Sequence, residues 1–131
     1  MTLLLDTHTF LWWLEGSRKL GRRARATIGA AESAVWVSAA TAWEIAIKMA
    51  LGRLALREPP ETCLPREILH SGFQTLAISV AHALAVRTLP LHHADPFDRM
   101  LVAQAEAEGM TLVTADTIFE RYGVPTLDAR E

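Results

Sequence analysis

Short apolar runs alternate with longer amphipathic stretches along this chain of 131 residues. The runs are rich in Leu, Val and Trp, and near-continuous apolar composition is typical of strands that are buried on both faces of a sheet. They predict strands over Thr2–Leu5, Ser33–Ser38, Phe73–Ile78, Met110–Thr114 and Val124–Leu127. Because helical segments separate most of these strands, we expect the strands to lie parallel. The pattern therefore predicts a three-layer α/β/α sandwich with a central, mostly parallel sheet.

The segments between these strands carry helical periodicity and residues that are typical of helix ends. Gly16, Gly52 and Gly109 end three of them, and Pro96 opens another. They predict helices over Thr7–Leu14, Arg18–Glu32, Ala39–Leu51, Pro65–His70, Val80–Thr88 and Pro96–Gly109, and a helical turn over Thr117–Arg121. Residues Arg53–Leu64, which contain two adjacent prolines, are expected to form a loop. No linker or internal repeat interrupts the pattern, so residues 1–131 are expected to form one domain.

The composition excludes several classes of protein. Half of the residues are hydrophobic (50%), which excludes a disordered chain, and a chain of this length can bury roughly two-thirds of the surface that its unfolded form exposes. No apolar run approaches the ~20 residues that span a bilayer. The apolar start at Leu3–Leu5 meets Asp6 at once and follows no basic residue, so a signal peptide is not expected. A single cysteine, Cys63, excludes a disulfide framework and predicts the reducing cytoplasm as the compartment.

Acidic residues fall next to the ends of predicted strands. Asp6 directly follows the first strand, and Asp116 follows the strand Met110–Thr114 by two residues. Asp98 lies in the first turn of the helix that Pro96 opens, and Glu44 lies in the helix after the second strand. In parallel sheets, ligands bind beyond the carboxyl ends of the strands. We therefore expect all four acids to converge on one edge of the sheet.

Helix capping is an alternative interpretation of the aspartates. An aspartate between a strand and a helix commonly accepts a hydrogen bond from a backbone N–H, and this role remains open for Asp6 and Asp116. Asp95 directly precedes Pro96, so it is the better cap of its helix. Capping therefore leaves Asp98 unexplained.

Two of the acids lie on apolar helix faces. Asp98 precedes Leu101 by three residues and Val102 by four, so it shares their inward face. A carboxylate there is costly unless something pairs with it. Glu44 lies in an equally apolar run, where a surface ion pair with Lys48, four residues on, is the alternative interpretation.

Carboxylates that gather in one place indicate a bound cation. They repel one another, and their pKa values rise unless a cation is present. Oxygen ligands with few nitrogens or sulfurs select Mg²⁺ or Mn²⁺, and such an ion can activate a water for hydrolysis of a phosphodiester. The formal net charge of −2 argues against binding nucleic acid through bulk charge, but an acidic site can hold a polyanion through a bridging cation.

Three sequence blocks resemble the PIN-domain nucleases, and more closely the VapC-type toxins of bacterial toxin–antitoxin pairs. The blocks are LLLDTHTFLWWL near the start, VSAATAWEIAIKMALGRL in the middle, and HHADPFDRMLVAQAEAEGMTLVTAD near the end, followed by FERYGV. The resemblance covers nearly the whole chain. The first aspartate alone is a weak signal, but three blocks in the right order, each with its acid in place, are a specific one.

The resemblance implies a Mg²⁺-dependent endoribonuclease with its acids at Asp6, Glu44, Asp98 and Asp116. Asp95 would be an accessory acid, and Ser38 and Thr114 match small polar positions that line the site in this family. It also implies a homodimer and a VapB-like antitoxin that inserts a C-terminal segment near the site. Such complexes bind promoter DNA through the antitoxin.

Basic and aromatic residues each allow two interpretations. The basic residues Arg18, Lys19, Arg22, Arg23 and Arg25 could contact the RNA backbone or an acidic antitoxin segment, or could form a solvated helix face. Trp36 and Trp43 are expected in the core, although tryptophans can also stack on bases. Trp12 and Trp13 are adjacent, so a helix cannot bury both equally well.

The histidines do not form a zinc motif. His92 and His93 are adjacent, Cys63 is isolated, and no HExxH sequence is present, so zinc is not expected. His8 follows Asp6 by two residues and could face the site or pack beside it.

Two other functions that occur on similar folds need residues that this chain lacks. A phosphatase of the haloacid dehalogenase type needs a second aspartate where this chain has His8, and a receiver domain needs a late lysine where it has Thr114-Ala115-Asp116. A non-catalytic RNA binder that inhibits translation, and a DNA-directed nuclease on the same fold, remain as alternatives.

Overall fold

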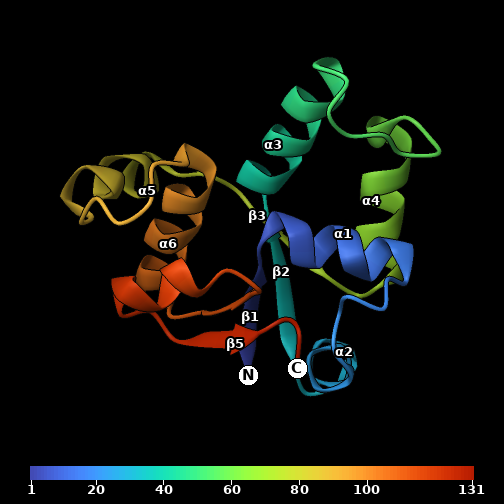
Figure 1. Ribbon diagram of the computed structural model, residues 1–131, viewed down its shortest axis with the longest axis horizontal. Coiled ribbons are helices and arrows are strands. Elements are labelled where there is room, and N and C mark those ends of the chain that lie inside the picture. Colours follow the sequence, from blue (N-terminus) through green and yellow to red (C-terminus); the bar gives the residue numbers. More distant parts are fainter.

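The computed structural model describes residues 1–131. The strands are β1 (Thr2–Leu5), β2 (Ala34–Ser38), β3 (Gln74–Leu76), β4 (Thr111–Thr114) and β5 (Thr126–Asp128). The α-helices are α1 (Thr7–Glu15), α2 (Arg22–Gly29), α3 (Ala39–Ala50), α4 (Pro60–His70), α5 (Val80–Ala85) and α6 (Pro96–Glu108). Two 3₁₀ helices, η1 (Val86–Thr88) and η2 (Thr117–Tyr122), complete the chain (Figure 1).

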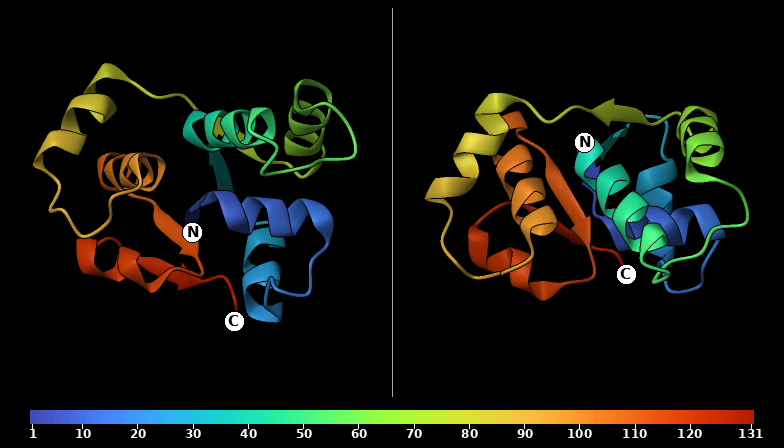
Figure 2. Two further views of the ribbon diagram at one scale, coloured as in Figure 1. Left: turned by 45° about the horizontal axis from the view of Figure 1, so that its top comes forward. Right: turned by 90° about the horizontal axis from the view of Figure 1, so that it is seen from above.

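The five strands form one parallel sheet in the order β3-β2-β1-β4-β5. Helices α5, α6 and η2 lie on one side of this sheet, and α1, α2 and α4 lie on the other (Figures 1 and 2). The predicted three-layer α/β/α sandwich is therefore confirmed, and every strand pair is parallel. None of the helices is both long and apolar enough to cross a membrane.

Successive residues of β1 point into two different hydrophobic clusters. Leu3 and Leu5 pack in a cluster with residues of α1, α2 and α4, whereas Leu4 packs with residues of α6 and η2. All three leucines are completely buried. This alternation follows from the two-residue repeat of a strand and explains why the run is apolar at every position.

The two tryptophans predicted in the core have different environments. Trp36 is half-buried and packs against the cluster that contains Leu4, which lies opposite it in the sheet. The prediction is wrong for Trp43, whose relative exposure is 58%. Trp43 lies on an exposed face of α3 and contacts the ring of Phe97 edge-on, with the ring centroids 5.0 Å apart. The apolar run in α3 therefore does not bury every face of that helix.

Helix α2 begins four residues later than predicted, at Arg22 instead of Arg18. The side chain of Ser17 accepts a hydrogen bond from the backbone N–H of Lys19, and its carbonyl accepts one from Leu20. These local bonds form a turn before the helix, as serine side chains commonly do. Arg18 and Lys19 therefore lie outside the helix that was expected to carry them.

Helix α4 begins five residues earlier than predicted, at Pro60 instead of Pro65. Residues 60–64, which were expected in a loop, are helical. The carbonyl of Pro59 accepts hydrogen bonds from Thr62 and Cys63 at 3.0 and 3.1 Å. A proline in the first helical turn removes an N–H that has no partner inside the helix, so the proline pair opens a helix here.

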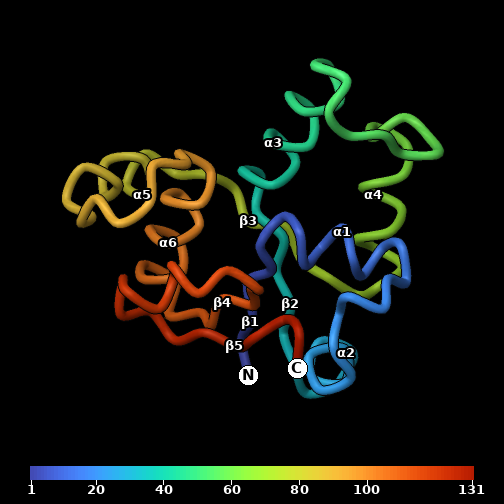
Figure 3. The backbone as a smooth tube through the Cα atoms, in the orientation of Figure 1, coloured from blue at the N-terminus to red at the C-terminus, as the bar shows by residue number.

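The carboxyl ends of the central strands lie at one edge of the sheet, where the chain turns into helices. Figure 3 shows β1 passing into α1 and β2 passing into α3 at this edge. Asp6, between β1 and α1, and Ser38, at the end of β2, are the helix N-caps at these two turns. The topology thus places residues that are far apart in sequence at one edge.

Candidate active site

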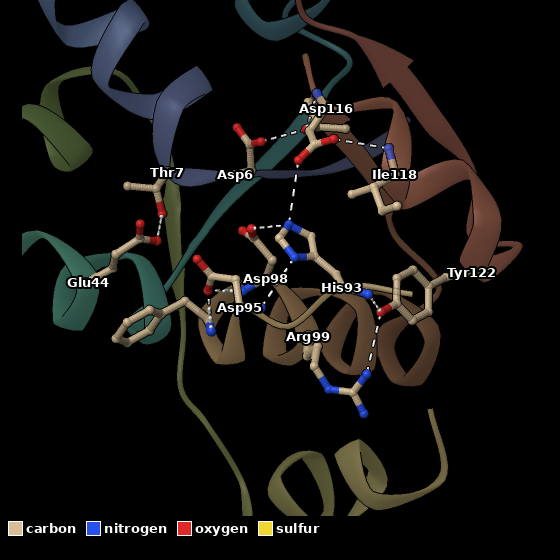
Figure 4. A network of polar contacts seen from close by, with 12 residues as sticks. Asp6, Thr7, Glu44, His93, Asp95, Asp98, Arg99, Asp116, Ile118 and Tyr122 are labelled. Carbon is tan, nitrogen blue, oxygen red and sulfur yellow. Dashed lines mark hydrogen bonds and ion pairs between the residues drawn. The ribbon is translucent and has the colours of Figure 1, made fainter. Parts of the chain in front are cut away.

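Four carboxylates from four segments converge at this edge of the sheet. Asp6 follows β1, Glu44 lies in α3, Asp98 lies in the first turn of α6, and Asp116 follows β4. They line a cavity of about 170 Å³, which we call the acid cleft and show in Figure 4. The other residues of the acid cleft are Thr7, His8, Lys48, His93, Asp95 and Phe119.

Asp6 is buried and accepts hydrogen bonds through both carboxylate oxygens. Oδ1 accepts from the backbone N–H of Thr9 at 2.9 Å, and Oδ2 accepts from the hydroxyl of Thr114 at 2.6 Å. Burial raises the pKa of Asp6, and the hydrogen bonds from Thr114 and Thr9 oppose this rise. Asp6 is thus a helix cap and also a wall of the acid cleft, so the two interpretations of its position do not exclude each other.

The pKa of Asp98 in the acid cleft is also raised. Its side chain is 20% exposed. Burial raises its pKa to about 8, and repulsion from Asp95, Asp6, Glu44 and Asp116 adds to the rise. The carboxylates are therefore close enough to repel one another. A cation bound among them would oppose this shift.

Glu44 is buried near the middle of α3 and does not lie on the surface. One oxygen accepts a hydrogen bond from the hydroxyl of Thr7 at 2.7 Å, and the other lies 2.5 Å from Nζ of Lys48. The expected ion pair with Lys48 is therefore present, but its acid is only 4% exposed and lines the acid cleft.

Asp116 is the most exposed of the four acids, with half of its side chain accessible. Its Oδ1 accepts a hydrogen bond from the N–H of Ile118 and so caps η2. Its own N–H donates to the hydroxyl of Thr114, which in turn donates to Asp6. Thr114 therefore ties two of the acids together, and it does so from the end of β4.

The other predicted accessory residues have different surroundings. Asp95 caps α6 through hydrogen bonds from the N–H groups of Phe97 and Asp98, and it lines the acid cleft. Ser38 caps α3, and its hydroxyl donates to Gln104. Ser38 does not line the acid cleft.

A family model of the PIN domain matches residues 3–125, which is most of the chain. The chain belongs to the PIN-domain family. It is 32% identical over 115 residues to Ribonuclease VapC22 of Mycobacterium tuberculosis, a match that covers 88% of this chain and 87% of the relative. Within the PIN domains it is therefore a VapC-type protein, as the resemblance of its motifs predicted.

Solved structures of VapBC complexes share this fold. The complex VapBC2 of Rickettsia felis, bound to a DNA fragment from its promoter, matches with a TM-score of 0.71 and 16% identity. DNA-bound VapBC of Salmonella typhimurium matches with a TM-score of 0.69 and 20% identity. Each match covers 98% of both chains. At these identities the likeness concerns the fold.

The donor set of this PIN domain suits a hard divalent cation. Nucleases of the family generally use divalent metals, and the acid cleft offers carboxylate oxygens, of which those of Glu44 pair with Lys48. Atoms of His93, Asp98 and Asp116 lie within 4.8 Å of one another, close enough for one ion.

Two basic residues lie beside the acid cleft of this PIN domain. Lys19 and Arg130 line a neighbouring cavity of about 520 Å³ that Asp6 and Asp116 also border.

The other predicted basic residues have different surroundings. Arg25 donates to the carbonyl of Ser17, and its guanidinium lies 5.9 Å from the ring centroid of Trp13. Arg23 lies 3.6 Å from the carboxylate of Glu131. Arg18 and Arg22 line a separate cavity with Gly16 and Leu20.

Three polar residues of the acid cleft and its rim had no predicted role in the site. Thr7 holds Glu44, His93 faces Asp98, and Arg130 borders the cavity that contains Lys19. Thr7 follows Asp6 directly and His93 precedes Asp95 by two positions, so proximity to the motif acids was the available signal. Nothing in the sequence around Arg130 marked it.

Proposed function

We propose that this VapC-type PIN domain is a Mg²⁺-dependent endoribonuclease toxin whose ion is held by Asp6, Glu44, Asp98 and Asp116. The observation that carries the proposal is the set of mutually repelling carboxylates at the carboxyl edge of the sheet, where burial and the neighbouring acids raise the pKa of Asp98 to about 8. Mn²⁺ has the same preference for oxygen ligands and is expected to substitute.

Each part of the acid cleft has a role in this proposal. Bound Mg²⁺ would neutralise charge on a phosphate and lower the pKa of a water. Asp6 is held rigidly by Thr114 and Thr9, so it does not need to reorganise when the ion arrives. Asp116 is the most exposed of the four acids and also borders the neighbouring cavity, through which the phosphate of a substrate would enter. Lys19 and Arg130 would contact neighbouring phosphates of the strand.

The proposed antitoxin and DNA partners are inferred from solved structures with the same fold. VapBC complexes among the structural matches support a VapB-like antitoxin for this chain, and the DNA-bound examples support promoter binding by the complex, through the antitoxin. We further propose that the protein is a homodimer and acts in the cytoplasm, where its RNA substrate is found.

Induction of the chain alone in bacteria, with sequencing of new RNA 5′ ends, tests the proposal. We compare wild type with Asp98→Asn, and Glu44→Gln with Glu61→Gln. Glu61 is exposed in the first turn of α4 and lies outside the acid cleft, so it is a matched control. Growth arrest with discrete new ends is expected for wild type and Glu61→Gln only.

Two other results would contradict the proposal. Arrest by wild type and Asp98→Asn alike, without new ends, would indicate a non-catalytic RNA binder that inhibits translation. Digestion of single-stranded DNA in preference to RNA by the purified protein would indicate a DNA-directed nuclease. Circular dichroism of each variant must match wild type, since a loss of fold would also abolish activity.

A further inference from the structure

His93 lies on a loop that a network of hydrogen bonds holds in place beside the acid cleft. Its backbone N–H donates to the hydroxyl of Tyr122 at 2.8 Å. The guanidinium of Arg99 donates to the carbonyls of Val86, Leu89 and Pro90, at 2.8–3.3 Å. Figure 4 shows that Arg99 points away from the acids, although it directly follows Asp98. These contacts fix the backbone from which the His93 side chain extends.

The orientation of the imidazole determines where its proton lies. Nδ1 of His93 accepts a hydrogen bond from the backbone N–H of Asp95 at 3.2 Å. A backbone N–H can only donate, so Nδ1 presents its lone pair and the proton of the neutral ring is on Nε2. A flipped ring would place carbon atoms against the N–H of Asp95 and against Asp98, and would lose both contacts.

The protonated nitrogen faces two of the candidate metal ligands. Nε2 lies 2.9 Å from Oδ2 of Asp98 and 3.5 Å from Oδ2 of Asp116 (Figure 4). The ring is about three-quarters buried, with 23% of the side chain exposed, and it lies T-shaped to the ring of Phe119, with the ring centroids 6.1 Å apart. The imidazole therefore has little freedom to turn away from these two carboxylates.

We propose that His93 is a positioning residue that orients the carboxylates of Asp98 and Asp116 through its Nε2–H, and that it is not itself a ligand of the ion. This inference rests on the proposed function. Ligating carboxylates are themselves hydrogen-bonded in metal sites, and such partners fix the direction of the remaining lone pairs. Binding of the ion by Nε2 would require the proton to move to Nδ1, where it would oppose the N–H of Asp95 donor against donor.

Nitrogen NMR of the imidazole tests the assignment of the proton without any measurement of activity. In protein labelled with ¹⁵N at histidine, we expect His93 in the Nε2–H tautomer, both without metal and with saturating Mg²⁺. Mn²⁺ bound to the protein should show no direct coupling to an imidazole nitrogen in pulsed electron paramagnetic resonance. Deprotonation of Nε2 on Mg²⁺ addition, or a coupled nitrogen that disappears in His93→Ala, would overturn the inference.

A series of substitutions tests the positioning role. The carboxamide N–H of glutamine reaches about as far as Nε2, whereas that of asparagine reaches only to the Nδ1 position. We expect the affinity for Mg²⁺ and kcat/KM for RNA cleavage to fall about 10- to 100-fold in His93→Ala and His93→Asn. His93→Gln should recover most of the loss. His70→Ala, at an exposed histidine of α4, is the control and should match wild type.

The two proposals fail in different ways. Equal Mg²⁺ affinity and kcat/KM for His93→Gln, His93→Ala and wild type would overturn the role of His93 and leave the nuclease intact. If the wild-type protein shows no RNA cleavage that is lost in Asp98→Asn, the proposed function is overturned. The affinity for Mg²⁺, measured by calorimetry, would then test the positioning role of His93 by itself. Weaker binding of Mg²⁺ by His93→Ala than by His93→Gln would support that role, and equal binding would overturn it.

Discussion

Two clusters of charged residues on this molecule differ in how their acids are surrounded. In the acid cleft, carboxylates of like charge share a small, largely buried cavity, and the pKa of Asp98 rises to about 8. On α4, Arg66 lies between Glu58 and Glu67, and its hydrogen bonds to Glu58 lower the pKa of that carboxyl. Acids in the second cluster have a partner supplied by the fold, whereas acids in the first repel one another.

This difference supports the proposal that a cation binds in the acid cleft and not at the Arg66 cluster. The Arg66 cluster is exposed, and ion pairs in water contribute little to stability. The acid cleft holds carboxylates whose mutual repulsion a bound cation would relieve, and such arrangements are typical of functional sites.

The largest effect is expected on RNA cleavage. Asp98→Asn should lower kcat/KM for a purified RNA substrate by at least ~10³-fold, because it removes a ligand of an ion that contributes several kcal/mol to catalysis. Arg66→Ala should stay within about twofold of wild type, since surface ion pairs contribute little. Initial rates of RNA cleavage in saturating Mg²⁺ measure kcat/KM for both variants. A comparable loss in Arg66→Ala would remove the contrast between the two clusters.

Mg²⁺ should stabilise the wild-type protein and leave Asp98→Asn nearly unaffected. At a concentration of 100 times Kd, binding to the folded state adds about 2.7 kcal/mol to the free energy of unfolding. Thermal unfolding at pH 8, with and without Mg²⁺, reveals this as a higher Tm. An equal rise of Tm in both proteins would mean that the ion binds elsewhere.

The stability of the metal-free protein should fall as the pH rises from about 4 to about 8. Asp98 has a folded-state pKa above its ordinary value, so the folded protein binds more protons than the unfolded chain within this window. Its contribution is fully present below pH 4 and is lost as the pH passes 8. The free energy of unfolding should drop by several kcal/mol across this window relative to Asp98→Asn.

Urea titrations of wild type and Asp98→Asn at several pH values measure this difference. The variant should be the more stable protein at pH 8, and the two should converge near pH 4. A difference that does not change with pH would show that repulsion at Asp98 is not its cause.

The smallest effect is expected for Glu58→Gln, and it has the opposite sign. The lowered pKa of Glu58 means that its contribution to stability is present above its ordinary pKa and is lost as the pH falls. Because Glu58 and Arg66 are exposed, the Tm at pH 7 should stay within a degree or two of wild type. A larger drop would show that this ion pair is structurally important.

Much of the fold could be predicted from the sequence because strand and helix patterns are local properties. The apolar runs predicted all five strands, and Pro96 and Gly109 marked the ends of α6. The misplaced starts of α2 and α4 share one cause. Serine and proline are compatible with turns and with first helical turns alike, and only neighbouring contacts decide between them.

The sequence by itself determined which acids are present, their places after strands and on helices, and the membership of the chain in the PIN-domain family. Their convergence had to be inferred, because Asp6 and Asp116 are 110 residues apart. Only the tertiary structure decided that Trp43 is exposed, that Thr114 bridges Asp6 and Asp116, and that His93 faces Asp98. These contacts depend on side-chain directions between elements distant in the chain, which no local pattern encodes.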